Sequence, residues 1–180
     1  MTIIWGDWYD SDTKMLKLLW EGIPNVNVVH LTKKWNSVME NAVDLAISNE
    51  KDTLLICGHG TQYGLLVPQS FTEYAVHRMN VGLIQAKRVV GIMCYGAEFA
   101  KSVGLHGLFS SMFISNVNEA VDNSIFTTRE TIHETNAVIL GIINEYLANI
   151  ITLDECLQKL QCETSANAVA EFNASGVQVV

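Results

Sequence analysis

Two short apolar runs, each ending at a reactive side chain, constrain the fold of this chain more than any other feature. The first run, Leu54–Cys57, leads into His59 and Gly60. The second run, Arg88–Met93, leads into Cys94. Runs of this length that are rich in Val, Ile and Leu and bounded by Gly are typical of strands buried on both faces. Both runs therefore predict inner strands of a sheet that is covered by helices.

The order of the remaining patterns predicts an α/β fold. Strand and helix patterns alternate along the first third of the chain, which is typical of a sheet with parallel strands. Strands are expected at Thr2–Trp5, Val26–Leu31, Leu54–Cys57, Arg88–Met93 and Ser110–Ser115. We expect a three-layer α/β/α sandwich around a mostly parallel sheet of about five or six strands.

Helical patterns occupy much of the rest of the chain. Capping-box patterns predict a helix over Phe71–Met79 and a last helix that starts at Thr152 and ends at Leu160. A short helix over Ala97–Val103 is expected to end at Gly104. An apolar stripe at helical spacing predicts a long helix across 132–146, whereas the polar residues 116–123 are expected to form a loop.

The chain is expected to be one domain. Its 180 residues suit a single core, and we find no internal repeat and no linker that would divide it. We assign residues 1–162 to this domain. Residues 163–180 are small and polar with little periodicity, so they are expected to form a loosely packed C-terminal tail.

Composition and charge argue against several classes of function. The net charge is −8 and no Lys/Arg cluster offsets it, so we expect no nucleic-acid partner. No apolar run reaches the roughly 20 residues of a membrane span, so we expect no membrane partner. The four cysteines lack the spacing of a zinc site, so no metal is expected. Free thiols and an N-terminus without a signal-peptide pattern predict a cytoplasmic protein.

His59 and Cys94 are the candidate catalytic pair. The carboxyl ends of parallel strands meet at one edge of a sheet, which is where ligands bind in such folds. An imidazole and a thiol that share one cleft form a Cys–His nucleophile. Cys94 also precedes the helix expected over Ala97–Val103, and we expect the dipole of that helix to favour the thiolate. Cys57, inside the preceding strand, is interpreted as core packing.

The same two strand ends resemble those of the caspase-like cysteine peptidases of clan CD. These include caspases, clostripain-like peptidases, gingipains, legumain and separase. Their shared signature is an apolar strand that ends in His-Gly and a later apolar strand that ends in Cys, matched here by His59, Gly60 and Cys94. Caspases carry Gln-Ala-Cys-x-Gly at the nucleophile, but Ile92 and Met93 precede Cys94 here. The resemblance is therefore closer to compact bacterial clostripain-like and caspase-like members.

This resemblance implies an activity and a role for each residue. The chain is expected to be a cysteine endopeptidase in which Cys94 forms a thioester acyl-enzyme and His59 serves as general acid and base. The backbone N–H groups of Gly60 and Cys94 are implied as the oxyanion hole. A peptide or protein is then the partner, as substrate, and the chemistry needs no cofactor. The resemblance also implies that the strands ending at His59 and Cys94 are neighbours.

Acidic residues near the expected cleft suggest a substrate preference. Asp7 and Asp10 follow the first strand, and Glu119 and Asp122 follow the fifth. A carboxylate in a desolvated pocket pairs well with a guanidinium, so we predict cleavage after Arg or Lys at P1. No Arg is expected at the cleft, which argues against cleavage after Asp. Ile92 occupies a position where relatives carry an acid, so a small apolar P1 residue is the alternative.

Two other classes of function stay open from the sequence. The first is a caspase-like domain without catalytic activity that acts as an interaction module. The second is a flavodoxin-like binding or signalling domain in which the cysteine and histidine are incidental. A flavodoxin-like domain needs a loop that cradles phosphate after the first strand, and the acidic, bulky segment Gly6–Asp10 suits phosphate poorly.

Overall fold

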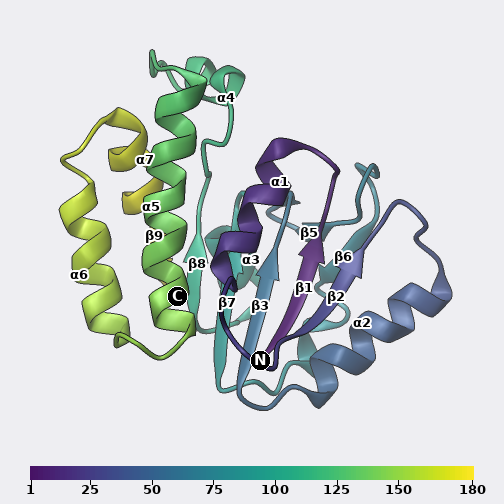
Figure 1. Cartoon of the computed structure of the whole chain (residues 1–180). Coiled ribbons are helices and arrows are strands. Elements are labelled where there is room, and N and C mark those ends of the chain that lie inside the picture. The colour runs from purple at the N-terminus through teal and green to yellow at the C-terminus, as the bar shows by residue number, and fades with distance from the viewer.

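The computed structural model describes residues 1–180 as an α/β fold around a six-stranded sheet with the strand order β2-β1-β3-β7-β8-β9 (Figure 1). The first five strands in that order are parallel, and β9 runs antiparallel to β8. Their bounds are Thr2–Gly6 (β1), Asn27–Leu31 (β2), Thr53–Cys57 (β3), Arg88–Ile92 (β7), Leu108–Ser110 (β8) and Val177–Val179 (β9). The prediction of a mostly parallel sheet is confirmed.

Seven α-helices and two short 3₁₀ helices accompany the sheet. The α-helices are Ser11–Met15 (α1), Ser37–Asn49 (α2), Gly96–Val103 (α3), Val117–Asp122 (α4), Arg129–Leu147 (α5), Leu153–Glu163 (α6) and Ala168–Gly176 (α7). The 3₁₀ helices are Leu16–Leu19 (η1) and Val81–Leu83 (η2). The predicted capping box is present at the start of α6, between Thr152 and Glu155. Gly104 ends α3 in a left-handed conformation, as expected.

The two faces of the sheet support two separate apolar cores, which arises from the alternation of side chains along each strand. On one face Ile3, Leu55 and Ile92 pack against η1, α5 and α6. On the other face Ile4 and Ile56 pack with α2, α3 and the smaller sheet. The fold is thus consistent with a three-layer α/β/α arrangement, and Cys57 lies fully buried in the first core, as predicted.

A second, three-stranded sheet follows His59. It contains β4 (Gly60–Thr61), β5 (Gly64–Leu66) and β6 (Tyr74–His77), and all its neighbours are antiparallel. The predicted helix over Phe71–Met79 is therefore wrong. Ser70 Oγ accepts from the N–H groups of Thr72 and Glu73, which makes only a turn. Pairing with β5 then holds the following residues as a strand, so tertiary contacts override the local helix signal.

The C-terminal segment is packed into the fold, contrary to the expectation of a loose tail over 163–180. Asn167 caps α7 by accepting from the N–H groups of Val169 and Ala170. The β9 strand pairs with β8 and adds the sixth strand to the sheet. The expected loop at 116–123 is also wrong, because Asn116 caps the short helix α4. The predicted strand at Ser110–Ser115 starts and ends earlier, as β8.

Candidate active site

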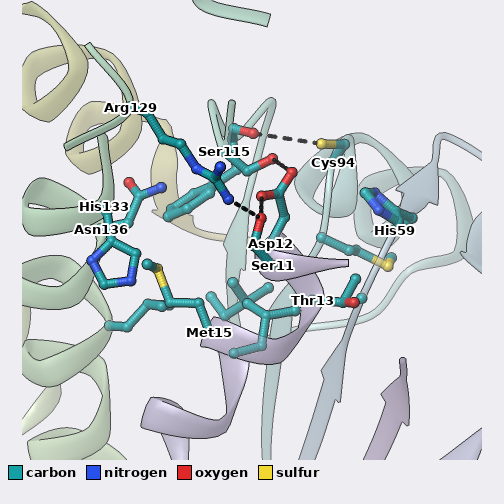
Figure 2. Close-up of a pocket in the computed structure, with 16 residues that line it drawn as sticks. Ser11, Asp12, Thr13, Met15, His59, Cys94, Ser115, Arg129, His133 and Asn136 are labelled. Atoms are coloured by element: carbon teal, nitrogen blue, oxygen red, sulfur yellow. Dashed lines mark hydrogen bonds between the residues drawn. The ribbon is translucent and has the colours of Figure 1, made fainter. Parts of the chain in front are cut away.

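His59 and Cys94 occupy equivalent positions at the carboxyl edge of the sheet. Strands β3 and β7 are neighbours, as expected, with Cys57 opposite Ile92 in the register. His59 lies two residues after Cys57, and Cys94 lies two residues after Ile92. Both side chains line one cavity with a volume of about 70 Å³ (Figure 2). The strand ends thus bring the imidazole and the thiol to a common narrow site.

Gly60 allows the segment after β3 to approach the segment after β7. A Cβ added at Gly60 would lie 2.9 Å from the Met93 side chain and 3.0 Å from the carbonyl oxygen of Cys94. Ser110 holds the Cys94 turn from the other side, because its hydroxyl accepts from Met93 N and donates to Met93 O, both at 2.9 Å. Any side chain at this position would therefore have to displace the Met93 side chain or the Cys94 carbonyl, and glycine avoids both contacts.

The imidazole of His59 is held by Asp10. Nε2 of His59 lies 3.0 Å from Oδ2 of Asp10. An ionised carboxylate can only accept, so Nε2 carries the proton, and Nδ1 has no hydrogen-bond partner within the protein. Burial raises the pKa of Asp10, but hydrogen bonds from the Thr13 backbone and from His59 outweigh it, so this pKa lies below its ordinary value. The carboxylate therefore orients the ring and leaves Nδ1 free.

Asp10 is placed by its role as the N-cap of α1. Its Oδ1 accepts from the backbone N–H and from the hydroxyl of Thr13, both at 2.7 Å. Asp10 was expected as an acid near the cleft, and the structure shows that it also caps α1. The same carboxylate reaches His59 through its other oxygen. One side chain thus connects the start of α1 to the candidate base.

The Cys94 thiol is protonated and turned toward backbone in this structure. Its Sγ donates to the carbonyl oxygen of Phe113 at 3.8 Å, and no hydrogen bond joins it to His59. Burial raises the pKa of Cys94 to about 11, and the charge of Glu119 adds to the increase. The expectation that the following helix favours a thiolate is therefore wrong. Tyr95, in a left-handed conformation with φ of 59°, separates Cys94 from the first turn of α3.

The cavity is also lined by polar side chains from α1, from α5 and from the loop after β8 that were not predicted from the sequence. These are Asp12, Ser115, Arg129, His133 and Asn136. The hydroxyl of Ser115 lies 3.1 Å from Oδ2 of Asp12 and 2.9 Å from Oε2 of Glu119. Arg129 donates to the Ser11 hydroxyl at 3.3 Å and forms no ion pair (Figure 2). No local sequence signal brings these residues together, because they come from segments that are far apart in the sequence and meet only in the folded chain.

None of the four acids expected at the substrate pocket lines the cavity, but two of them form hydrogen bonds with residues that do. Asp10 binds His59, and Glu119 binds Ser115 through both its backbone N–H and its hydroxyl. Asp7 is buried and lies 3.1 Å from Nε2 of His30, away from the cavity. Asp122 is exposed at the end of α4. The carboxylate that lines the cavity is Asp12, which was not among the four expected acids.

The absence of an Arg at the cleft was also predicted wrongly, since Arg129 lines the cavity at the start of α5. Nowhere in the structure, the cavity included, does a group of three or more His, Cys, Asp or Glu side chains converge as a metal site would require. No helix combines the length and the apolar character needed to cross a bilayer.

Comparisons with known proteins add no relative to this picture. No protein-family model, no curated protein and no solved structure matches the chain. The geometry of the site and the two strand-end motifs at His59 and Cys94 are therefore the features that bear on function.

Proposed function

We propose that this chain is a cysteine endopeptidase of caspase-like fold in which Cys94 is the nucleophile and His59 the general acid and base. The observation that carries this proposal is the position of the two residues at matched ends of adjacent parallel strands, lining one cavity. The ring of His59 supports it further, because Asp10 holds Nε2 and leaves Nδ1 to exchange protons.

The proposed reaction proceeds through a thioester. The Sγ–H proton of Cys94 passes to Nδ1 of His59 as Sγ attacks the scissile carbonyl carbon. The tetrahedral oxyanion accepts hydrogen bonds from the backbone N–H groups of Gly60 and Cys94, and each such donor contributes about 3 kcal/mol in other hydrolases. The C–N bond then breaks, and His59 protonates the leaving amine. Water, deprotonated by His59, hydrolyses the thioester and releases the acid and the thiol.

Substrate binding has to convert the resting site into a reactive one. The thiol donates to Phe113 O at rest, and burial raises its pKa to about 11. A peptide carbonyl in the cavity competes for this side chain, and a rotation about χ1 turns Sγ toward it. Catalytic hydrogen bonds are often long or misaligned before substrate binds, so the resting geometry is compatible with this role.

The direct test measures peptide hydrolysis by wild type, Cys94→Ala and His59→Ala. Both variants should lose activity to background, since each removes a group that the chemistry cannot replace. Cys57→Ala is the matched control, because Cys57 is a fully buried thiol in the core of the sheet and takes no part in the reaction. Hydrolysis that survives in Cys94→Ala would exclude the proposed nucleophile.

The proposed substrate preference is a basic P1 residue. Asp12 lines the cavity, Glu119 contacts its wall through Ser115, and neither carboxylate forms an ion pair within the protein. A guanidinium or ammonium group entering the cavity gains a charge-assisted hydrogen bond there. Arg129 opposes this preference and favours an acidic P1 residue instead, so the two charges make opposite predictions.

Two variants separate these predictions in a positional peptide library. Asp12→Asn keeps the size of the side chain and should reduce cleavage after Arg and Lys about tenfold, by loss of about one charged hydrogen bond. Arg129→Met should leave that cleavage intact or improve it. Cleavage after Asp or Glu that disappears in Arg129→Met would show that the P1 proposal has the wrong sign.

A second candidate function is a caspase-like interaction module without peptidase activity. The observation that favours it is the protonated, backbone-directed thiol of Cys94. A flavodoxin-like role has less support, because Asp7 and Asp10 in the loop after β1 repel phosphate. The interaction module predicts no cleavage of any peptide, and binding to a protein partner that is identical in wild type and Cys94→Ala.

A further inference from the structure

Two aromatic side chains, Trp8 and Phe71, lie beside His59 on separate loops, and neither of them lines the cavity. The ring of Trp8 meets His59 edge-on, with centroids 4.9 Å apart and planes at 83°. Phe71 lies against Trp8, with centroids 5.4 Å apart. Trp8 follows β1 and Phe71 lies between β5 and β6. Two rings from distant parts of the chain thus form a continuous apolar surface that reaches the imidazole.

The loop that carries Trp8 is held in a defined shape. The backbone N–H of Trp8 donates to the hydroxyl of Thr13 at 3.0 Å, and that of Tyr9 donates to Asp7 at 2.8 Å. Tyr9 adopts a positive φ of 62°, which a tyrosine rarely does. The indole Nε1 of Trp8 is buried without a hydrogen-bond partner. Backbone hydrogen bonds and ring contacts therefore hold this indole beside His59, and the indole N–H contributes no hydrogen bond to its position.

Phe71 is unusual for a ring in this environment, because it is 79% exposed. Its one ring contact is with Trp8, so most of its apolar surface faces solvent. Apolar surface next to a reactive histidine is stabilised when a ligand covers it. The chemistry of the site decides which part of a ligand reaches that surface.

In the proposed mechanism His59 protonates the leaving amine. The nitrogen that leaves must come within hydrogen-bond reach of the imidazole. This nitrogen belongs to the residue that follows the scissile bond, P1′, so the P1′ side chain lies beside His59. We propose that Trp8 and Phe71 form the P1′ subsite of this peptidase and that the subsite takes an apolar side chain. This inference rests on the proposed function.

Charge near the subsite sharpens the preference. The carboxylate of Asp10 lies 3.0 Å from Nε2 of His59, and no Lys or Arg side chain pairs with it. An Asp or Glu at P1′ would bring a second negative charge to this carboxylate in a partly desolvated site, which is unfavourable. The subsite therefore selects Leu, Ile, Val, Met or Phe and disfavours acids.

The test is cleavage of a proteome-derived peptide library, read by mass spectrometry of the new N-termini. Each new N-terminus is a P1′ residue, and the residue that precedes it in the parent peptide is P1, so the library leaves both positions free to vary. The enzymes compared are wild type, Cys94→Ala as background, Phe71→Ser and Phe126→Ser. Phe126 is the matched control because it is 92% exposed, lies before α5 and forms no ring contact with Trp8.

We expect wild-type cleavage sites to be enriched in apolar P1′ residues. In Phe71→Ser this enrichment should fall about fivefold, the loss expected for one aromatic contact, with P1 unchanged. Trp8→Leu should reduce it as well, and Phe126→Ser should match wild type. Equal apolar enrichment in wild type and Phe71→Ser would overturn the P1′ assignment while leaving the peptidase intact. An absence of Cys94-dependent cleavage would instead overturn the proposed function, and the subsite with it.

Discussion

Oδ2 of Asp10 lies 3.0 Å from Nε2 of His59, while Oδ1 of the same carboxylate accepts from the backbone of Thr13 at the start of α1. A single side chain therefore performs a structural task and a site-orienting task. Because the helix cap fixes the carboxylate, it also fixes the tautomer of the histidine. This link suggests a variant in which the two tasks can be separated.

Asp10→Asn should preserve the fold and reduce the proposed peptidase activity. Asn is as good a helix cap as Asp, so α1 should keep its start. The Asn amide can donate to Nε2, which moves the imidazole proton to Nδ1 and leaves no acceptor for the Cys94 proton. We expect kcat to fall on the order of 10²- to 10⁴-fold. Peptide hydrolysis measures this loss, and circular dichroism checks the helix content.

The control for this variant is Asp7→Asn, which removes the carboxylate that pairs with His30. It should keep its activity, because His30 lies outside the cavity lining. Equal losses in the two variants would indicate a general effect of charge in this loop.

Gly60→Ala should impair the site by displacing the Cys94 turn. The added Cβ would lie 2.9 Å from Met93 Sδ and 3.0 Å from Cys94 O, so one of the two must move. Small displacements of catalytic groups are costly, and we expect kcat/KM to fall by about 10- to 100-fold. Gly82→Ala is the matched control, since a Cβ at Gly82 would contact nothing within 4 Å. Wild-type kinetics for Gly60→Ala would show that this contact is tolerated.

The alkylation of Cys94 by iodoacetamide should depend steeply on pH. Burial raises its pKa to about 11, so the thiolate fraction and the rate should increase about tenfold per pH unit from neutral pH to pH 10. Peptide mass spectrometry measures the rate at each cysteine, and exposed Cys162 should label first at neutral pH. A rate that levels off below pH 8 would mean that a thiolate already exists at rest.

Glu119→Gln should shift this alkylation profile to lower pH. The charge of Glu119 is the second cause that raises the pKa of Cys94, after burial.

The raised pKa of Cys94 also affects the stability of the fold. An unfolded thiol ionises near 9.0, before the folded one, so the contribution of Cys94 to stability is full below pH 9 and is lost as pH rises toward 11. Urea unfolding across this range should show stability decreasing.

Asn173→Ala should destabilise the fold through the segment that contacts Cys94. The fully buried Asn173 accepts from Ile114 N at 2.7 Å and donates to Ile114 O at 2.9 Å. Removing it leaves a buried backbone N–H unpaired, and we expect a loss of about 2–4 kcal/mol in the free energy of unfolding. Asn123→Ala, at an exposed helix end, should change this free energy by less than about 0.5 kcal/mol. A small effect at Asn173 would mean that water replaces its amide.

The sequence alone was sufficient for the parallel strands and for the placement of His59 and Cys94. Apolar runs such as Leu54–Cys57 have few alternatives to a buried strand, because burial on both faces requires an apolar side chain at every position. The register of β3 and β7 then carries both reactive residues to one edge. The start of α6 was also predictable, because a capping box depends only on neighbouring residues.

Tertiary structure decided what local patterns cannot encode. Residues 74–77 became a strand because β5 offers pairing partners, and residues 168–179 became a helix and an edge strand because β8 and α5 offer packing surfaces. Asp12 and Arg129 meet at the cavity from distant parts of the chain. The pKa of Cys94 depends on desolvation by these packed segments, so the helix dipole inferred from sequence was outweighed by burial that exists only once the chain is folded.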